Sequence, residues 1–168
     1  MEQELPWPYK EGYNYDVEHV RVEIYRLLNQ FLAQEKMCYL CKEDSWLEHA
    51  LDVVGQYFDV ETQRILIQAA TVSRVIDDCE EQDFKLRNFN TECGQLIENL
   101  KDSLVIPLSL REACNKIMHA AKYRYDVDEE TGIVNPTLYL YGSYNGNKWK
   151  AIINVVDFCK QYLNNVVG

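Results

Sequence analysis

The stretch TLYLYGSYNGNKWKAIINV, residues 137–155, decides the fold because it predicts a β-hairpin. Leucine, isoleucine and tyrosine, which are common in strands, lie on both sides of Asn145-Gly146. This dipeptide is favoured in two-residue hairpin turns, since both positions need a positive φ. One face of the second strand should carry Trp149, Ala151, Ile153 and Val155. Because a lone hairpin is marginally stable in water, that face should pack on helices or another strand.

Upstream of the hairpin, the spacing of apolar residues predicts helices. Apolar residues recur at steps of three and four over 17–31, which is typical of an amphipathic helix. Ser45 and Glu48 form a capping box at the start of a second helix. Asp59 can cap a third helix that follows a tight bend and ends near residue 78.

The following part of the chain is predicted to be a loop over 79–90 and then a weaker helix over 91–101. SLVIP, residues 103–107, favours a short extended piece because the residue before a proline avoids helical geometry. Ser109 and Glu112 form a second capping box, and the helix that they start should end near residue 125.

These elements predict a mainly α fold, a single helical-bundle domain of five or six helices with a C-terminal β-hairpin. Residues 1–168 should form one domain, since a chain of 168 residues with 47% hydrophobic content can bury one sizeable core. Within it we expect a lead-in segment over 1–13, a helical part over 14–125, and the hairpin with a final helix over 137–165.

The composition predicts a cytoplasmic protein with reduced thiols and no membrane span. No stretch has the roughly 20 consecutive apolar residues that would cross a bilayer, and the first residues do not look like a signal sequence. Six cysteines are therefore expected to be free. Cys38 and Cys41 have the spacing of half a zinc site, but no second pair follows, so neither a metal nor a cofactor is expected.

Acidic residues dominate the charge and predict a basic protein partner. There are 27 Asp and Glu residues against 17 Lys and Arg, a net charge of −10. Such a field repels phosphate backbones, so nucleic acid is the less favoured partner. The alternative is that these charges only keep the protein soluble. The acidic candidates for partner binding form two clusters: Glu43, Asp44, Glu48, Asp52, Asp59 and Glu61, then Asp77, Asp78, Glu80, Glu81 and Asp83.

Aromatic residues of the hairpin are further candidates for partner binding. These are Tyr139, Tyr141, Tyr144 and Trp149, with Lys148 and Lys150 close by. Tyrosine rings supply contact area at low entropic cost, which suits recognition of a partner. The alternative is cross-strand packing, which stabilises any hairpin.

One segment carries candidate catalytic groups. In LREACNKIMHAAKYRYD, residues 110–126, Asn115 and His119 lie on the polar face of the predicted helix, one turn apart. The stretch CNKIMH resembles the Arg-Asn-x-x-x-His motif of HEPN domains, small helical bundles that include many RNases. The resemblance implies roles for Asn115 and His119, but Cys114 stands at the arginine position. Arg111 would have to replace it from two helical turns away, which puts activity in doubt.

The function predicted from the sequence is that of a non-enzymatic acidic binding protein, an immunity- or antitoxin-like factor that neutralises a basic protein partner. No residue is assigned a catalytic role. Two alternatives stay open. The first is a HEPN-like ribonuclease or inactive relative that uses His119, Asn115 and Arg111; residues 101–124 carry five bases against two acids, which could hold RNA. The second is a structural subunit that self-assembles, for example as a homodimer.

Overall fold

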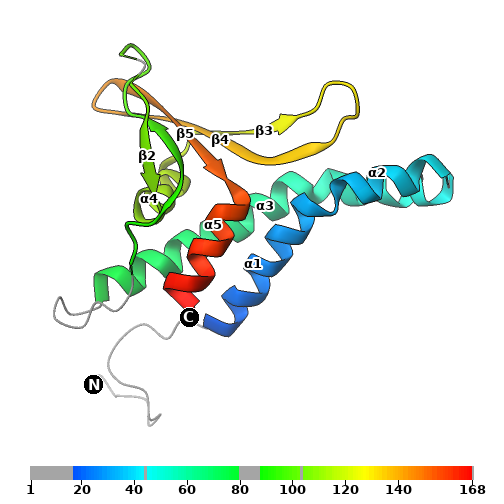
Figure 1. Ribbon diagram of the computed structural model, residues 1–168, viewed down its shortest axis with the longest axis horizontal. Helices are drawn as coiled ribbons and strands as arrows, with labels where there is room; N and C mark the ends of the chain where they lie inside the picture. Colours follow the sequence, from blue (N-terminus) through cyan, green and yellow to red (C-terminus); the bar gives the residue numbers. More distant parts are fainter. Residues whose placement is uncertain (1–16, 44, 80–87, 103, 168) are drawn as a thin grey trace, which may run out of the picture.

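The structure of the protein, a computed structural model, describes residues 17–43, 45–79, 88–102 and 104–167 (Figure 1). For residues 17, 45–56 and 79 it describes the backbone alone. The helices are α1 (Val17–Leu32), α2 (Gln34–Glu43), α3 (Ser45–Cys79), α4 (Leu110–His119) and α5 (Val155–Tyr162), which continues as the π-helical turn η2 (Leu163–Val167). The strands are β1 (Glu92–Ile97), β2 (Ile106–Ser109), β3 (Lys122–Val127), β4 (Val134–Tyr144) and β5 (Asn147–Asn154).

The strands form one antiparallel sheet in the order β2-β1-β5-β4-β3. Figure 1 shows the described helices gathered on one side of this sheet, with α5 leaving β5 directly and lying between the sheet and α1. Residues therefore alternate along each strand between a face covered by helices and an open face. On β5, for example, Trp149, Ala151 and Ile153 are buried, whereas Lys148 and Asn154 are exposed.

The predicted mainly α bundle with a terminal hairpin is wrong, because a sheet of five strands makes this an α+β fold. Strand β1 replaces the helix predicted over 91–101. Strand β3 replaces the second half of the helix predicted to reach residue 125, and α4 ends at His119. Alternation is seen in β3, where Tyr123 and Tyr125 are half-buried while Lys122 and Arg124 face solvent. Strand β1 is defined instead by its pairing with β2 and β5, since its buried residues Cys93 and Leu96 are three positions apart.

The predicted hairpin is confirmed. Tyr144 pairs with Asn147 at the end of the β4–β5 ladder. Between them Asn145 has φ 48° and Gly146 has φ 80°, the two positive values that a type I′ turn needs. The expected apolar face of β5 is confirmed for Trp149, Ala151 and Ile153, which are all buried. Val155 is buried too, but it begins α5 and is not part of the strand.

The tight bend predicted before Asp59 is also wrong. Helix α3 runs without interruption over 35 residues, or roughly 50 Å. Asp59 does not cap a new helix but accepts a hydrogen bond at 2.7 Å from the side chain of Gln63, one turn later in the same helix. No proline interrupts residues 45–79, so the helix can continue through the position of the predicted bend. Helices α1, α2 and α4 pack along its length and stabilise it.

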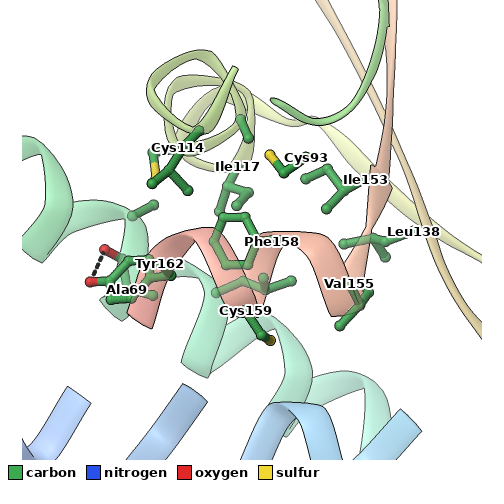
Figure 2. Packing of buried hydrophobic residues seen from close by; sticks show 14 of the residues in the cluster. Ala69, Cys93, Cys114, Ile117, Leu138, Ile153, Val155, Phe158, Cys159 and Tyr162 are labelled. Carbon is green, nitrogen blue, oxygen red and sulfur yellow. Dashed lines mark hydrogen bonds between the residues drawn. The ribbon is translucent and has the colours of Figure 1, made fainter. Parts of the chain in front are cut away.

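The core lies where α5 meets α3, α4 and the covered face of the sheet. Figure 2 shows Phe158 and Tyr162 of α5 in this cluster, with Ile117 of α4 close to the Phe158 ring. Both aromatic residues are fully buried. Tyr162 donates a hydrogen bond at 2.8 Å from its hydroxyl to the carbonyl oxygen of Ala69, so its buried polar atom is satisfied. Helix α5 is thus held from both sides.

Three cysteines belong to the same core, namely Cys93, Cys114 and Cys159 (Figure 2). Burial raises the pKa of each of these thiols to about 12. Cys38, Cys93, Cys114 and Cys159 are free thiols. Cys38 and Cys41 lie on α2 and are partly exposed.

This difference in burial predicts selective thiol modification. At pH 8, a pKa of about 12 leaves about one thiol in ten thousand as the reactive thiolate. Maleimide should therefore modify Cys38 and Cys41 in the native protein and reach Cys93, Cys114 and Cys159 only after unfolding in guanidinium. Peptide mass spectrometry on timed samples measures this. Modification of Cys114 at the rate of Cys38 would contradict the described core.

Strand β1 needs a glycine at its centre. Gly94 pairs with Leu108 on β2 and with Ile153 on β5, next to an irregularity in the β1–β2 register. A Cβ atom added at Gly94 would overlap the backbone carbonyl oxygen of Ile152. Strands β1 and β5 would have to move apart to admit this atom, because the obstacle is backbone and not a flexible side chain.

Replacement of Gly94 by alanine should therefore destabilise the protein strongly. We expect Gly94→Ala to lower the free energy of unfolding by about 3 kcal/mol or more, since the overlap opens the sheet at β1 and β5. The matched control is Gly146→Ala, which has open space around its Cβ and should lose about 1 kcal/mol for its positive φ alone. Urea titrations compare the two variants. Equal stabilities would show that β1 does not lie where the register places it.

Candidate functional site

The open face of the sheet brings together side chains from three strands. Residues that pair across antiparallel strands lie side by side on one face. Tyr141 pairs with Lys122 on β3 and with Lys150 on β5. Tyr139 pairs with Arg124 on β3 in the same way. These pairs lie opposite to the buried residues of β4, Leu138 and Leu140, and so belong to the open face.

We call the resulting surface the tyrosine–cation patch. It consists of Lys122, Arg124, Tyr139, Tyr141, Lys148 and Lys150. The tyrosines come from β4, and the cations flank them from β3 on one side and β5 on the other. Lys122, Arg124 and Lys148 are exposed, whereas the other three members are partly buried. Along each strand the members are two residues apart, which is about 7 Å. The patch is therefore a compact group of four cations around two aromatic rings.

Two of the cations, Lys150 and Arg124, lie against the rings. The Nζ atom of Lys150 is 4.6 Å from the ring centre of Tyr139 and 5.7 Å from that of Tyr141. The guanidinium carbon of Arg124 is 5.7 Å from the ring centre of Tyr141. Exposed contacts of this kind each contribute about 0.5–1 kcal/mol. They hold the side chains in place loosely enough for a ligand to displace them.

Asp126 marks one border of the patch. Its carboxylate accepts a hydrogen bond at 3.4 Å from the Tyr139 hydroxyl and another at 3.1 Å from the Asn135 side chain. Burial and the nearby Asp126 carboxylate both raise the pKa of Tyr139. The Tyr139 ring therefore stays neutral at any physiological pH.

The open face becomes acidic beyond that border. An open hollow of about 500 Å³ lies between the ends of β1, β4 and β5, where α5 begins. Its polar lining consists of Glu92, Gln95, Thr137, Asn154 and Asp157. Asn154 caps α5 by accepting a hydrogen bond at 3.0 Å from the backbone of Asp157, so part of this lining serves the helix. The open face thus has a cationic end near the hairpin tip and an acidic end near α5.

The predicted acidic candidates are largely engaged within the chain. Each of the five whose side chains are described has a partner in its own chain: Glu43 (Tyr39), Asp59 (Tyr125 and Gln63), Glu61 (Arg64), Asp77 (Arg111) and Asp78 (Arg74 and Arg111). Asp44, Glu80, Glu81 and Asp83 lie outside the described residues, as do the side chains of Glu48 and Asp52.

Asp77 and Arg111 join α3 to α4. One Arg111 nitrogen lies 2.7 Å from the Asp77 carboxylate, which is only 5% exposed. A second nitrogen lies 3.9 Å from Asp78. A buried carboxylate requires such a partner, because an unpaired charge in the interior is costly. Asp77 is thus a structural residue at this junction.

The structure does not bring the three HEPN-like candidates together. Arg111 points to Asp77, and the side-chain amide of Asn115 donates to the Glu112 carboxylate at 3.3 Å. His119 is the last residue of α4 and is exposed. Eight residues separate Arg111 from His119, which is about 12 Å along a helix. Asn115 and His119 thus lie one turn apart on α4, as predicted, whereas Arg111 is engaged by Asp77 and does not join them in a single chain.

The predicted aromatic candidates divide between two faces. Tyr139 and Tyr141 belong to the open face, and Tyr144 is 72% exposed at the hairpin tip. Trp149 is 3% exposed on the covered face, where Lys116 of α4 lies 4.7 Å from its ring centre and Gly142 leaves room for it. Trp149 therefore packs in the fold and does not share a surface with the tyrosines.

Two members of the patch could not be assigned from the sequence. Lys122 and Arg124 fall in the segment predicted to be helical, where they would not have faced the hairpin. The signal that could have found them is the alternation of cation and tyrosine in Lys122-Tyr123-Arg124-Tyr125, which fits a half-buried strand.

Among the side chains that the structure describes, no group of three or more His, Cys, Asp and Glu residues could hold a metal ion. Within the same described ranges, no helix has the length and apolar character needed to cross a bilayer.

No family model matches this chain significantly, and neither does any curated protein or solved structure.

Proposed function

We propose that this is a non-enzymatic binding protein that recognises an anionic partner through the open face of its sheet. The observation that carries the proposal is the tyrosine–cation patch. Four cations surround two tyrosine rings on a surface that no described helix covers. Groups of this kind supply both charge and contact area to a partner.

The acidic balance of the chain does not prevent such binding. Charges more than a Debye length away are largely screened, and this length is about 8 Å at physiological salt. The acids paired with Arg64 and Arg111 belong to the helix layer, on the other side of the sheet. A partner in contact with the patch therefore meets the four local cations and, at one border, the Asp126 carboxylate.

A binding role also agrees with the state of the candidate catalytic groups. Arg111 is held by Asp77, Asn115 by Glu112, and His119 stands apart from Arg111. An acid–base mechanism needs its groups within hydrogen-bond reach of one reacting atom. This favours binding over RNase chemistry for a single chain.

The basic protein partner predicted from the net charge is the second candidate. Its support is the net charge of −10, but the described acids of the two predicted clusters are already engaged within the chain. The immunity- or antitoxin-like role is one context for either kind of binding and stays a prediction.

Photo-crosslinking distinguishes the two candidates. A photoreactive amino acid replaces either Ser143, which pairs with Lys148 on the open face, or Tyr25, which is 65% exposed on α1. In native extract, we expect adducts from position 143. Lys122→Glu/Lys148→Glu should abolish them, because it reverses two of the four patch charges.

The matched control is Lys42→Glu/Lys160→Glu, which makes the same change in net charge at exposed positions of α2 and α5. It should leave the adducts unchanged. Adducts that form only from position 25, or that resist the patch reversal, would refute binding through the open face and favour the helix layer.

A further inference from the structure

We infer that the anionic partner is single-stranded nucleic acid, with bases on Tyr139 and Tyr141 and phosphates on the surrounding cations. This inference rests on the proposed function. The net charge favours a basic protein, but the patch is a local exception in which the ring and cation positions match both parts of a nucleotide.

The two rings suit stacking. Tyr139 and Tyr141 lie on the same face of β4 and are about 7 Å apart along the strand. Sheets with exposed aromatic side chains can stack two or three unpaired bases in this way. Because Tyr139 is kept neutral, its ring offers a base a π-face without charge.

The cations suit the backbone of the same ligand. Lys122 and Arg124 lie beside Tyr141 and Tyr139 on β3. On β5, Lys150 lies beside Tyr141, and Lys148 follows two residues nearer the hairpin tip, opposite Ser143. A strand whose bases stack on β4 would thus meet a cation on either side of the rings. Single-stranded binding proteins combine a positive track with aromatic platforms in this manner.

Lys150 connects the two kinds of contact. Its ammonium group lies over both rings in the free protein, at 4.6 and 5.7 Å from their centres. A stacked base contributes more than the exposed cation–π contact that it displaces. The displaced ammonium group is then free to contact a phosphate. An acidic peptide would contact the cations through its carboxylates, but its carboxylate side chains could not stack on the rings.

The tyrosine rings of the patch favour single-stranded over double-stranded nucleic acid. A duplex hides its base faces, so Tyr139 and Tyr141 could not stack on them. Four cations limit the number of displaced counterions to about four, so the logarithm of affinity should fall with the logarithm of salt with a slope of about −2.8. Raising the salt from about 50 to about 200 mM should weaken binding about fiftyfold.

Fluorescence anisotropy with a labelled uridine decamer tests the inference, with a glutamate decamer and polyphosphate as probes without bases. The decamer of uridine should bind more tightly than either. Tyr139→Leu/Tyr141→Leu should weaken uridine binding at least about tenfold and leave the salt slope unchanged. Lys122→Ala/Lys148→Ala should reduce the slope to about −1.4.

Three controls distinguish loss of the patch rings from loss of folding and from loss of tyrosines elsewhere. Tyr25→Leu/Tyr57→Leu removes two tyrosines that are 65% and 63% exposed on α1 and α3, and it should bind uridine like the natural chain. Thermal unfolding of every variant shows whether the sheet survives, and Tyr139→Phe/Tyr141→Phe keeps the rings and should keep binding.

The outcomes separate this inference from the proposed function. Equal binding of the glutamate decamer, with no effect of the tyrosine substitutions, would overturn the nucleic-acid inference and leave an acidic protein partner on the open face. Uridine binding that all patch variants retain would refute both. No uridine binding at 50 mM salt, with crosslinks still formed from position 143, would overturn the inference alone.

Discussion

The register of the β4–β5 hairpin is the constraint on which the rest of the structure depends. Its turn at Asn145-Gly146 fixes which residues pair, and the pleat then assigns every second side chain to the core. A shift by one residue would expose Trp149 and bury Lys150. Because the buried set is continuous from β4 through β5 into α5, such a shift would dismantle the core and the tyrosine–cation patch together.

Ion pairing divides the charges between the two layers. Arginines of the helices pair with buried or partly buried acids: Arg26 and Arg64 flank Glu23, and Arg111 pairs with Asp77. Bidentate guanidinium groups suit such sites better than ammonium groups do. The open face instead carries three lysines and Arg124, which contact rings and solvent. Among the described residues, arginines of the helix layer thus serve structural ion pairs, whereas Arg124 and Lys150 of the sheet contact tyrosine rings.

Sequence reasoning found the elements whose signals are local. The hairpin has its Asn-Gly turn, α1 has its apolar period, and Ser109 accepts the hydrogen bond from Glu112 that begins α4. It missed β1 and β3 because short segments such as 122–127 fit a helical or an extended period, and pairing with distant strands decides between them. The open face depends on that pairing. The acidic clusters looked available for two reasons: partners in the same helix, such as Arg64 for Glu61, were not considered, and distant partners, such as Arg111 for Asp77, depend on the fold.

A cationic patch on an acidic protein has a physical consequence for selectivity. Contacts with phosphates alone do not distinguish one polyanion from another, so a strongly basic protein binds many of them. Here the overall charge of −10 repels polyanions that stay at a distance. Only a ligand in close contact with the surface is attracted by the four patch cations, because charges further away are screened. A ligand that also stacks π-faces on Tyr139 and Tyr141 gains more binding free energy than a ligand that brings charge alone. The excess of acid and the tyrosine rings therefore both favour ligands that make close contact with the patch over ligands that bind by charge alone.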